Sequence, residues 1–283
     1  MKYQFMRFPG GLGKAFTASY DDGCAYDLRF ADRLAQSGIK CTFNLCCSKN
    51  STALTDEQIR EHIIGQGHEI AVHGAFHRAE GGLRAIEGIK DVLDCRLDLE
   101  ERFDCIVRGM AFPDFGITRF HNGATYDGVK QYLTELDIVY SRTLAGDNNS
   151  FRLPEDWHRW MPTAHHQNPN LFTWIDEFNA LNIDELYITQ KFPRLFYLWG
   201  HSYEFNNNNN WERLDEICDK ISGRDDTWYA TNMEIYEYTM AYRNLSWSAD
   251  GTRVYNPSLI DVWFTRDNVP FCVKSGETLK FNK

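Results

Sequence analysis

Apolar and polar residues alternate between strand-like and helix-like spacings along most of this chain. Residues 14–19 form an apolar-rich run that predicts a buried strand. Residues 26–37 carry apolar side chains at helical spacing, and Gly38 follows as a helix stop. The same succession predicts further strands at residues 39–46, 67–73, 105–112, 138–143, 157–165 and 194–203. It predicts further helices at residues 54–65, 83–103, 126–136, 171–181 and 211–221.

Alternation of strands and helices indicates a parallel sheet whose successive strands are joined by helical crossovers. In a chain of 283 residues, about seven such strands favour a closed or nearly closed (β/α) barrel. The five asparagines at 206–210 predict an exposed loop before the last of these helices.

The pattern changes from about Leu245 to short alternating segments separated by turn signals at 249–252 and 256–258. Strands are predicted at residues 262–264, 271–273 and 278–281. We therefore expect a barrel domain over residues 1–242 and a small C-terminal β annex over residues 243–283. The annex could cover an open seam of the barrel or form a subunit contact, which leaves a homo-oligomer open.

Composition narrows the class of partner. A formal net charge of −10 and a pI near 5.4 argue against nucleic acid, because phosphate binding relies on clustered Lys and Arg. No apolar run has the length of a membrane span, and residues 1–10 lack an apolar signal-peptide core, so we expect no membrane partner and a cytoplasmic location. The eight cysteines are scattered, which favours buried thiols in a reducing compartment over a metal or redox motif.

Candidate chemistry begins where the first predicted strand ends, in Ser19-Tyr20-Asp21-Asp22-Gly23. Adjacent carboxylates repel unless a cation or a shared proton lies between them. A turn at Gly23 would let Asp21 and Asp22 converge on one site, where one binds metal and the other takes protons. Alone, Asp-Asp-Gly is more typical of a turn between strand and helix, with a carboxylate as the helix N-cap.

Further polar residues follow other predicted strands of the barrel. His73 and His77 follow the third strand with a spacing that brings two imidazoles to one metal on a helical turn or tight loop. With Asp22 they would form a site that leaves coordination positions for water and substrate. Arg108 lies on the fourth predicted strand and His201 near the end of the seventh. Arg108 could instead form an ordinary ion pair, and His201 could be a buried structural histidine.

These residues resemble the motifs of the polysaccharide deacetylase family, which is carbohydrate esterase family 4 and carries the NodB homology domain. The family has five motifs on a distorted (β/α) barrel. Its first motif, T-F-D-D-G, resembles Ser19 to Gly23, which implies that Asp21 is the general base and Asp22 a metal ligand. Its second, H-[ST]-x-[ST]-H, implies His73 and His77 as ligands, although Gly74 and Phe76 stand where the motif has hydroxyl residues.

The remaining motifs extend the resemblance over residues 14–203 and leave the segment after Tyr242 outside it. The third motif implies that Arg108 pairs with the base Asp21, although the distance to Pro113 is stretched. The fourth contains Asp-Trp, for which Asp156-Trp157 is the candidate. The fifth, L-x-x-H, matches Leu198 to His201 and implies His201 as the general acid.

The resemblance implies a metal-dependent hydrolase that removes an acetyl group from an N-acetylated sugar. The cofactor would be one divalent transition metal, zinc first and cobalt or nickel as alternatives. Three other functions stay open: an O-acetyl esterase, a hydrolase of a non-sugar amide such as the cyclic ureide allantoin, and a carbohydrate-binding protein without catalysis.

Aromatic side chains near the predicted strand ends are candidates for stacking on a sugar. Tyr20, Trp157 and Trp199 are taken as substrate-binding residues, although such rings serve more often in packing. His165 and His166 follow the sixth predicted strand, so their participation is also left open.

Overall fold

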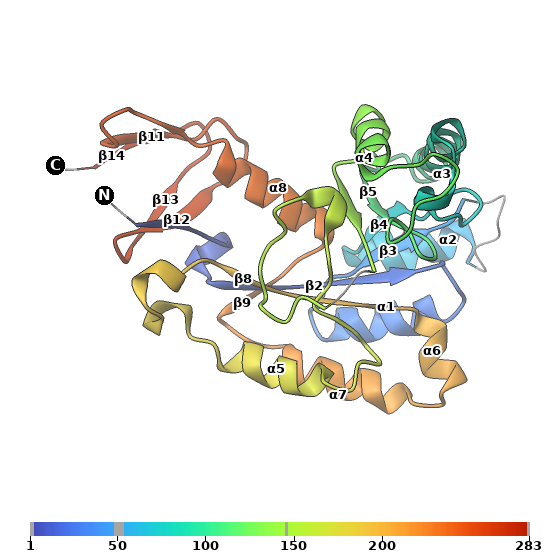
Figure 1. Cartoon of the computed structure of the whole chain (residues 1–283). Helices are drawn as coiled ribbons and strands as arrows, with labels where there is room; N and C mark the ends of the chain where they lie inside the picture. Colours follow the sequence, from blue (N-terminus) through green and yellow to red (C-terminus); the bar gives the residue numbers. More distant parts are fainter. Residues whose placement is uncertain (1–2, 48–53, 145–146, 282–283) are drawn as a thin grey trace.

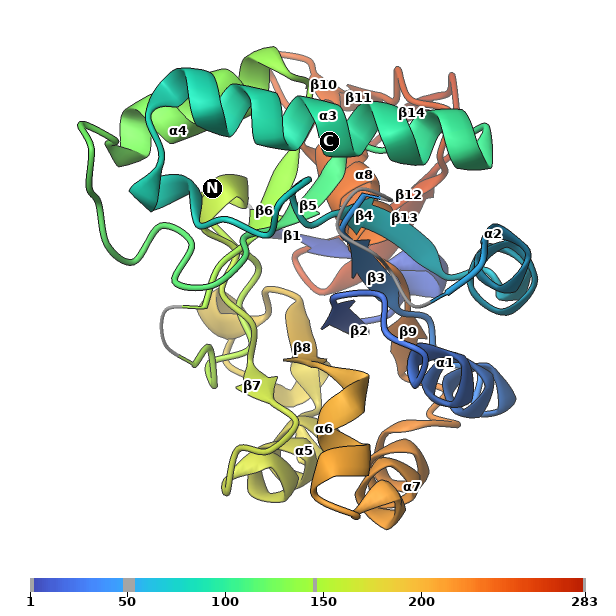
Figure 2. The same cartoon turned by 90° about the vertical axis from the view of Figure 1, so that its right-hand side faces the viewer.

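The computed structural model describes residues 3–47, 54–144 and 147–281. Its centre is a parallel sheet in the order β6-β5-β4-β3-β2-β8-β7, which curls into an incomplete barrel (Figures 1 and 2). The strands are β2 (Lys14–Asp21), β3 (Thr42–Leu45), β4 (Glu69–Val72), β5 (Gly109–Ala111), β6 (Tyr140–Arg142), β7 (Ala164–His165) and β8 (Arg194–Gly200). The predicted fold class, a distorted (β/α) barrel of about seven parallel strands, is confirmed.

Strand β2 lies inside the sheet between β3 and β8, and all eight of its residues are buried. Its last three residues pair with β3, while seven of its residues pair with β8 on the other side. A short strand, β9 (Thr227–Tyr229), pairs with the beginning of β2, where β3 does not reach. Because the carboxyl ends of parallel strands meet at one rim, Asp21 is held next to the ends of β3 and β8.

Helices cover the outside of the curled sheet (Figure 2). Helix α1 shows how they attach, because Phe30, Ala31 and Leu34 lie on its buried face and join the main core beside Phe43 of β3. The helices are α1 (Asp27–Gln36), α2 (Asp56–Gln58), α3 (Ala85–Phe103), α4 (Tyr126–Glu135), α5 (Leu171–Ala180), α6 (Ser202–Asn207), α7 (Trp211–Ile221) and α8 (Asn232–Arg243).

The strand predicted at 157–165 is wrong for most of its length. Trp157–Arg159 forms a single 3-10 turn, and only Ala164–His165 is extended as β7. The indoles of Trp157 and Trp160 pack against each other with ring centroids 4.9 Å apart, instead of alternating across a sheet. Pro162 also lacks the N–H that a ladder requires. In the described part of the chain β6 and β7 are therefore the two edges of the sheet and do not pair, and beyond its pairing with β5, β6 has only an isolated bridge from Arg142 to Trp160.

Two other predicted elements have different bounds. The strand predicted at 194–203 ends at Gly200, because α6 begins at Ser202. Helix α6 includes the first two residues of the asparagine run, so the predicted loop is confined to residues 208–210. The helix predicted at 54–65 starts at a capping box of Thr55 with Gln58, but continues as a π turn and a 3-10 turn to Gln66.

The segment after Arg243 forms strands of two small antiparallel sheets, which lie at one end of the molecule with both termini (Figure 1). One sheet contains β1, the N-terminal strand, which the sequence analysis did not identify. The Tyr238 hydroxyl of α8 donates to the Arg7 carbonyl and accepts from the Trp263 N–H. The strands are β1 (Gln4–Arg7), β12 (Val262–Arg266) and β13 (Val269–Val273) in one sheet, and β10 (Ser246–Trp247), β11 (Arg253–Tyr255) and β14 (Thr278–Lys280) in the other.

No helix in the described part of the chain has both the length and the apolar character needed to cross a membrane.

Candidate active site

Asp21 and Asp22 point to different partners because the chain turns sharply between them. Asp21 is the last residue of β2 and is buried. Asp22 has a φ of 81° and Gly23 a φ of 67°, so both adopt the left-handed conformation that reverses the chain. The turn at Gly23 predicted from the sequence is thus confirmed, and it places both carboxylates at the rim of the barrel.

Asp22 faces the two histidines of the loop that follows β4. Its Oδ1 lies 3.5 Å from His73 Nε2 and 3.2 Å from His77 Nε2. His77 has a φ of 51°, and its ring centroid lies 4.9 Å from that of His73. Burial alone would raise the pKa of Asp22, but the two imidazoles beside it hold that pKa well below its usual range.

The donor set of Asp22, His73 and His77 fits a divalent transition metal. The three ligand atoms lie within 4.8 Å of one another. His73 Nδ1 lies 2.9 Å from the Ala111 carbonyl oxygen, which can only accept, so Nδ1 carries the proton. The Nε2 lone pair of His73 therefore faces Asp22, as a metal ligand requires.

Asp21 is held by a different set of side chains. Arg142 ends β6, is fully buried, and its Nη2 donates to Asp21 Oδ2. Asn44 of β3 donates its Nδ2–H to Asp21 Oδ1 at 2.8 Å. Both carboxylate oxygens are thus fixed, and the guanidinium compensates the buried negative charge.

The prediction that Arg108 pairs with Asp21 is wrong. Arg108 precedes β5, so it lies at the amino end of the strands, opposite the rim that carries Asp21. Its Nε and Nη2 donate instead to the two carboxylate oxygens of Asp137, at 2.8 and 2.9 Å. Arg142 pairs with Asp21, as predicted for Arg108. Arg142 is the last residue of β6 and so lies at the rim, whereas Arg108 precedes β5.

His201 follows β8 and faces both aspartates across the rim. Its Nε2 lies 3.9 Å from Asp21 Oδ2 and 3.9 Å from Asp22 Oδ2. Its Nδ1 lies 3.2 Å from Oε1 of Glu204, one turn further along in α6. Burial alone would lower the pKa of His201, but the Glu204 contact and the two aspartates raise it above its ordinary value.

Glu204 also contacts the two histidines whose role the sequence left open. Its Oε2 lies 3.1 Å from His165 Nε2 and 2.9 Å from His166 Nε2. Burial would raise the pKa of Glu204, but the three imidazoles hold it well below its usual range. Burial lowers the pKa of His166 to about 4. Neither His165 nor His166 lines the cavity described below.

His165, His201 and Glu204 are close enough to hold a metal, but the protonation of His165 does not fit one. The Gln167 backbone N–H donates to His165 Nδ1 at 3.1 Å. Because Nδ1 accepts there, the proton of His165 lies on Nε2, the atom that faces Glu204. This cluster is therefore suited to directing imidazole N–H groups at one ionised carboxylate.

A cavity of about 230 Å³ opens at the rim between the aspartates and His201. It contains Trp199 from the predicted substrate-binding residues and, beside it, Phe112 and Tyr203. Its lining residues are Asp21, Asp22, His73, His77, Phe112, Asp114, Leu144, Trp199, His201 and Tyr203.

The predictions that Tyr20 and Trp157 bind substrate are wrong. Tyr20 is fully buried, because neighbours on a strand face opposite sides and its ring packs on Phe30 with centroids 3.8 Å apart. Trp157 is buried in a second core cluster against Trp160 and Tyr236. Its neighbour Asp156 bonds to Lys130 and Tyr126, away from the cavity.

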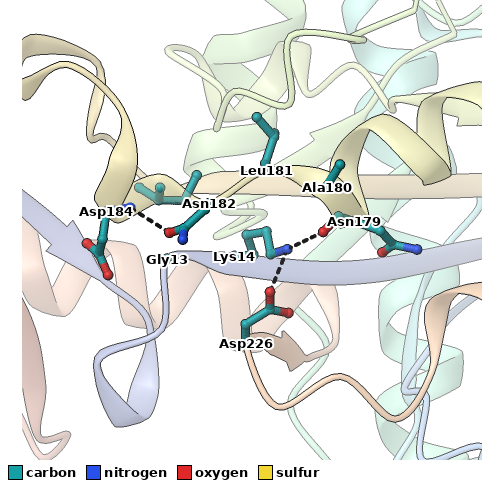
Figure 3. A pocket seen from close by; sticks show the side chains of 9 residues that line it. Gly13, Lys14, Asn179, Ala180, Leu181, Asn182, Asp184 and Asp226 are labelled. Atoms are coloured by element: carbon teal, nitrogen blue, oxygen red, sulfur yellow. Dashed lines mark hydrogen bonds and ion pairs between the residues drawn. The ribbon is translucent and has the colours of Figure 1, made fainter.

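A second cavity, of about 270 Å³, lies at the opposite end of β2 (Figure 3). Its buried cation, Lys14, contacts Asp226 at 2.8 Å and the carbonyl oxygens of Asn179 and Phe178 at 3.2 and 3.3 Å. These three partners use the three N–H donors of the ammonium group. No donor of Lys14 is left for a ligand.

Several residues at the rim were missed, and three of them left a signal in the sequence. Arg142 lies near the end of the strand predicted at 138–143. Polar residues at the ends of the other predicted strands were the candidates for the site. Asn44 is a polar residue inside the apolar run 39–46. Glu204 follows His201 by three residues, the spacing at which side chains meet on a helix.

The curled parallel sheet and its helices have the fold of polysaccharide deacetylases and family 4 carbohydrate esterases. A candidate polysaccharide deacetylase from Mycobacterium smegmatis aligns with a TM-score of 0.57 at 17% identity, covering 83% of this chain and 93% of that chain. The Xyl-CE4 domain of a multidomain xylanase from the hindgut metagenome of Trinervitermes trinervoides aligns with a TM-score of 0.51 at 16% identity, covering 84% and 98%. A family 4 acetyl xylan esterase from Clostridium thermocellum, in complex with a cobalt ion, aligns with a TM-score of 0.48 at 14% identity, covering 81% and 92%.

Sequence comparison adds nothing to this likeness: no protein-family model matches the chain, and no curated protein matches it significantly. At these identities the structural likeness establishes the fold, and the chemistry depends on the residues at the rim.

Proposed function

We propose that this protein is a metal-dependent hydrolase that removes an acetyl group from an N-acetylated sugar. The observation that carries the proposal is the convergence of Asp22, His73 and His77 in one cavity with Asp21 and His201. This is a metal-ligand set with a candidate base and a candidate acid beside it. The fold agrees with the proposal.

Asp22, His73 and His77 would hold one divalent metal, zinc in the first instance and cobalt or nickel as alternatives. Such a metal polarises an acyl carbonyl and lowers the pKa of a water molecule. The three ligands follow β2 and β4, the two strands that flank β3, so the barrel fixes their relative positions before substrate arrives.

Asp21 is the proposed general base. Arg142 and Asn44 fix its two oxygens, and the carboxylate also lines the cavity, where it can accept a proton from the attacking water. The water oxygen forms a bond to the acyl carbon as its proton passes to Asp21.

His201 is the proposed general acid. Its Nδ1–H is directed to Glu204, and in the protonated imidazolium form Nε2 carries the second proton, which faces the cavity. When the C–N bond breaks, Nε2 gives this proton to the departing amine, and the products are acetate and the free amino sugar. An O-acetyl ester would leave as an alcohol by the same transfer, so it is the second substrate class.

The test is acetate release from N-acetylated sugar oligomers by metal-loaded protein. Asp21→Asn should lower kcat by roughly 10²–10⁴-fold, the usual contribution of a general base, while metal content stays at the wild-type level. Arg108→Ala is the matched control and should change kcat less than about twofold, because its exposed pair with Asp137 contributes little.

The proposal fails if wild-type protein loaded with zinc, cobalt or nickel releases no acetate from sugar amides or sugar esters. Release of product from a cyclic ureide instead would keep the metal-dependent hydrolase and replace its substrate class. Tight sugar binding without turnover under every metal would move the assignment to a binding protein.

A further inference from the structure

The loop between His73 and His77 lacks the hydroxyl side chains expected by resemblance, yet it is firmly held by another group. Asp91 projects from α3 and is only 2% exposed. Its Oδ2 accepts the Ala75 N–H at 3.0 Å, and its Oδ1 accepts the Phe76 N–H at 3.1 Å. One carboxylate therefore binds two consecutive backbone N–H groups that lie between the two histidines.

Gly74 allows this carboxylate to approach. It has a φ of 77°, a conformation that favours glycine. A Cβ at this position would lie 2.4 Å from Asp91 Oδ2, well inside van der Waals contact. The glycine and the aspartate therefore form one structural unit, and a serine or threonine at position 74 would displace the carboxylate.

The other polar contacts of the same backbone are weaker. The Ala75 N–H is shared with the Asp91 carbonyl oxygen at 3.1 Å, and the Cys46 thiol lies 3.4 Å from the His73 carbonyl oxygen. A thiol is a weak donor, whereas hydrogen bonds to a carboxylate are about twice as strong as neutral ones. The Asp91 carboxylate is thus the strongest acceptor that these loop N–H groups have among the described residues.

We propose that Asp91, together with Gly74, is a positioning residue of the metal centre. It bends the loop so that His73 Nε2 and His77 Nε2 both face Asp22, and it replaces the hydroxyl side chains that Gly74 and Phe76 lack. This inference rests on the proposed function, because it assumes that Asp22, His73 and His77 bind a metal. Asp91 touches neither metal nor substrate and acts only through the loop.

The test is the dissociation constant for zinc, measured by competition with a chelator of known affinity, in wild type, Asp91→Asn and Asp91→Ala. Residues that orient metal ligands typically contribute 10–100-fold in affinity, so Asp91→Ala should raise the Kd by that factor. Asp91→Asn should also raise it, because its amide group presents a donor to one of the two loop N–H groups. The cobalt absorption spectrum should change in both variants, which altered stability alone would not cause.

The matched control is Asp98→Asn, on the same helix, where the carboxylate pairs with Arg102 near the surface. It should leave the zinc Kd unchanged. Gly74→Ala in otherwise wild-type protein should weaken zinc binding, and its effect should be smaller when Asp91 is already alanine, because the close contact is then gone.

A folded Asp91→Asn protein with wild-type zinc affinity and cobalt spectrum would overturn the proposal, as would equal effects of Gly74→Ala with and without Asp91. If Asp91→Ala does not fold, Asp91→Asn and Gly74→Ala still decide the question. Wild-type protein that binds no metal would contradict the proposed function itself. Failure of the proposed function can therefore be distinguished from failure of the Asp91 proposal, in which wild-type protein still binds zinc.

Discussion

Two clusters at the same rim contain the same kinds of residue but hold their protons differently. One consists of Asp22, His73 and His77, and the other of Glu204, His165 and His201. In the first, the Ala111 carbonyl fixes the proton of His73 on Nδ1 and leaves the Nε2 lone pair facing the carboxylate. In the second, the Gln167 N–H fixes the proton of His165 on Nε2, facing the carboxylate.

The difference shows that residue type and spacing do not by themselves define a metal site. The backbone group opposite each imidazole decides which nitrogen has a free lone pair. We therefore assign metal binding to the first cluster. To the second we assign the orientation of the general acid His201, which donates its Nδ1–H to Glu204.

The largest expected effect comes from breaking the first cluster with His77→Ala. Zinc that binds only the folded protein stabilises it, by about 2.7 kcal/mol at a hundredfold excess over Kd. Wild-type protein should show a rise in Tm with added zinc, and this rise should vanish in His77→Ala, along with acetate release. An equal zinc-dependent rise in the variant would contradict the assignment of His77 as a ligand.

An intermediate effect is expected from Glu204→Gln in the second cluster. With His201 as the proposed general acid, activity should fall at high pH as His201 loses its proton. Burial lowers the pKa of His201, and Glu204 is the largest of the groups that raise it. Removing the negative charge lowers that pKa, so the alkaline limb of the kcat/KM profile should move to lower pH. Asp21 and Asp22 still raise the pKa of His201, so the shift is partial.

At a pH above neutrality, Glu204→Gln should lower kcat/KM by roughly tenfold, part of the contribution of a general acid. Zinc affinity should stay at the wild-type level, which distinguishes this variant from His77→Ala. A pH profile that superimposes on that of wild type would exclude Glu204 as the partner that tunes His201.

The smallest effect is expected from His165→Gln. The glutamine amide can still donate to Glu204, so kcat/KM should change less than about threefold, within the contribution of one hydrogen bond. Zinc stoichiometry, measured by isothermal titration, should be the same as in wild type. Loss of one bound zinc ion in the variant would show that the second cluster binds metal.

The central fold could be predicted because its strands are continuous apolar runs separated by amphipathic helices of ordinary length. The pairing of β1 with β12 could not, because it joins segments more than 250 residues apart in the sequence and neither carries a local signal for the other. The strand predicted at 157–165 was wrong for a related reason: tertiary packing of Trp157 and Trp160, which the local pattern does not reveal, replaces strand pairing there.

The convergence of Asp22, His73 and His77 followed from their places after two predicted strands, and the structure brings them together. Arg108 was misplaced because its position along the predicted strand was uncertain by a few residues, enough to move it to the opposite end of the barrel. Tyr20 was misassigned because a one-residue step along β2 turns a side chain from the cavity to the helix layer.

The most direct test of this account is the metal content of purified wild type, Asp22→Ala and Glu204→Gln, measured by elemental mass spectrometry after loading with zinc and removal of the excess. About one ion per chain is expected in wild type and Glu204→Gln, and none in Asp22→Ala. One ion retained in Asp22→Ala and lost in Glu204→Gln would place the metal in the second cluster and contradict the account.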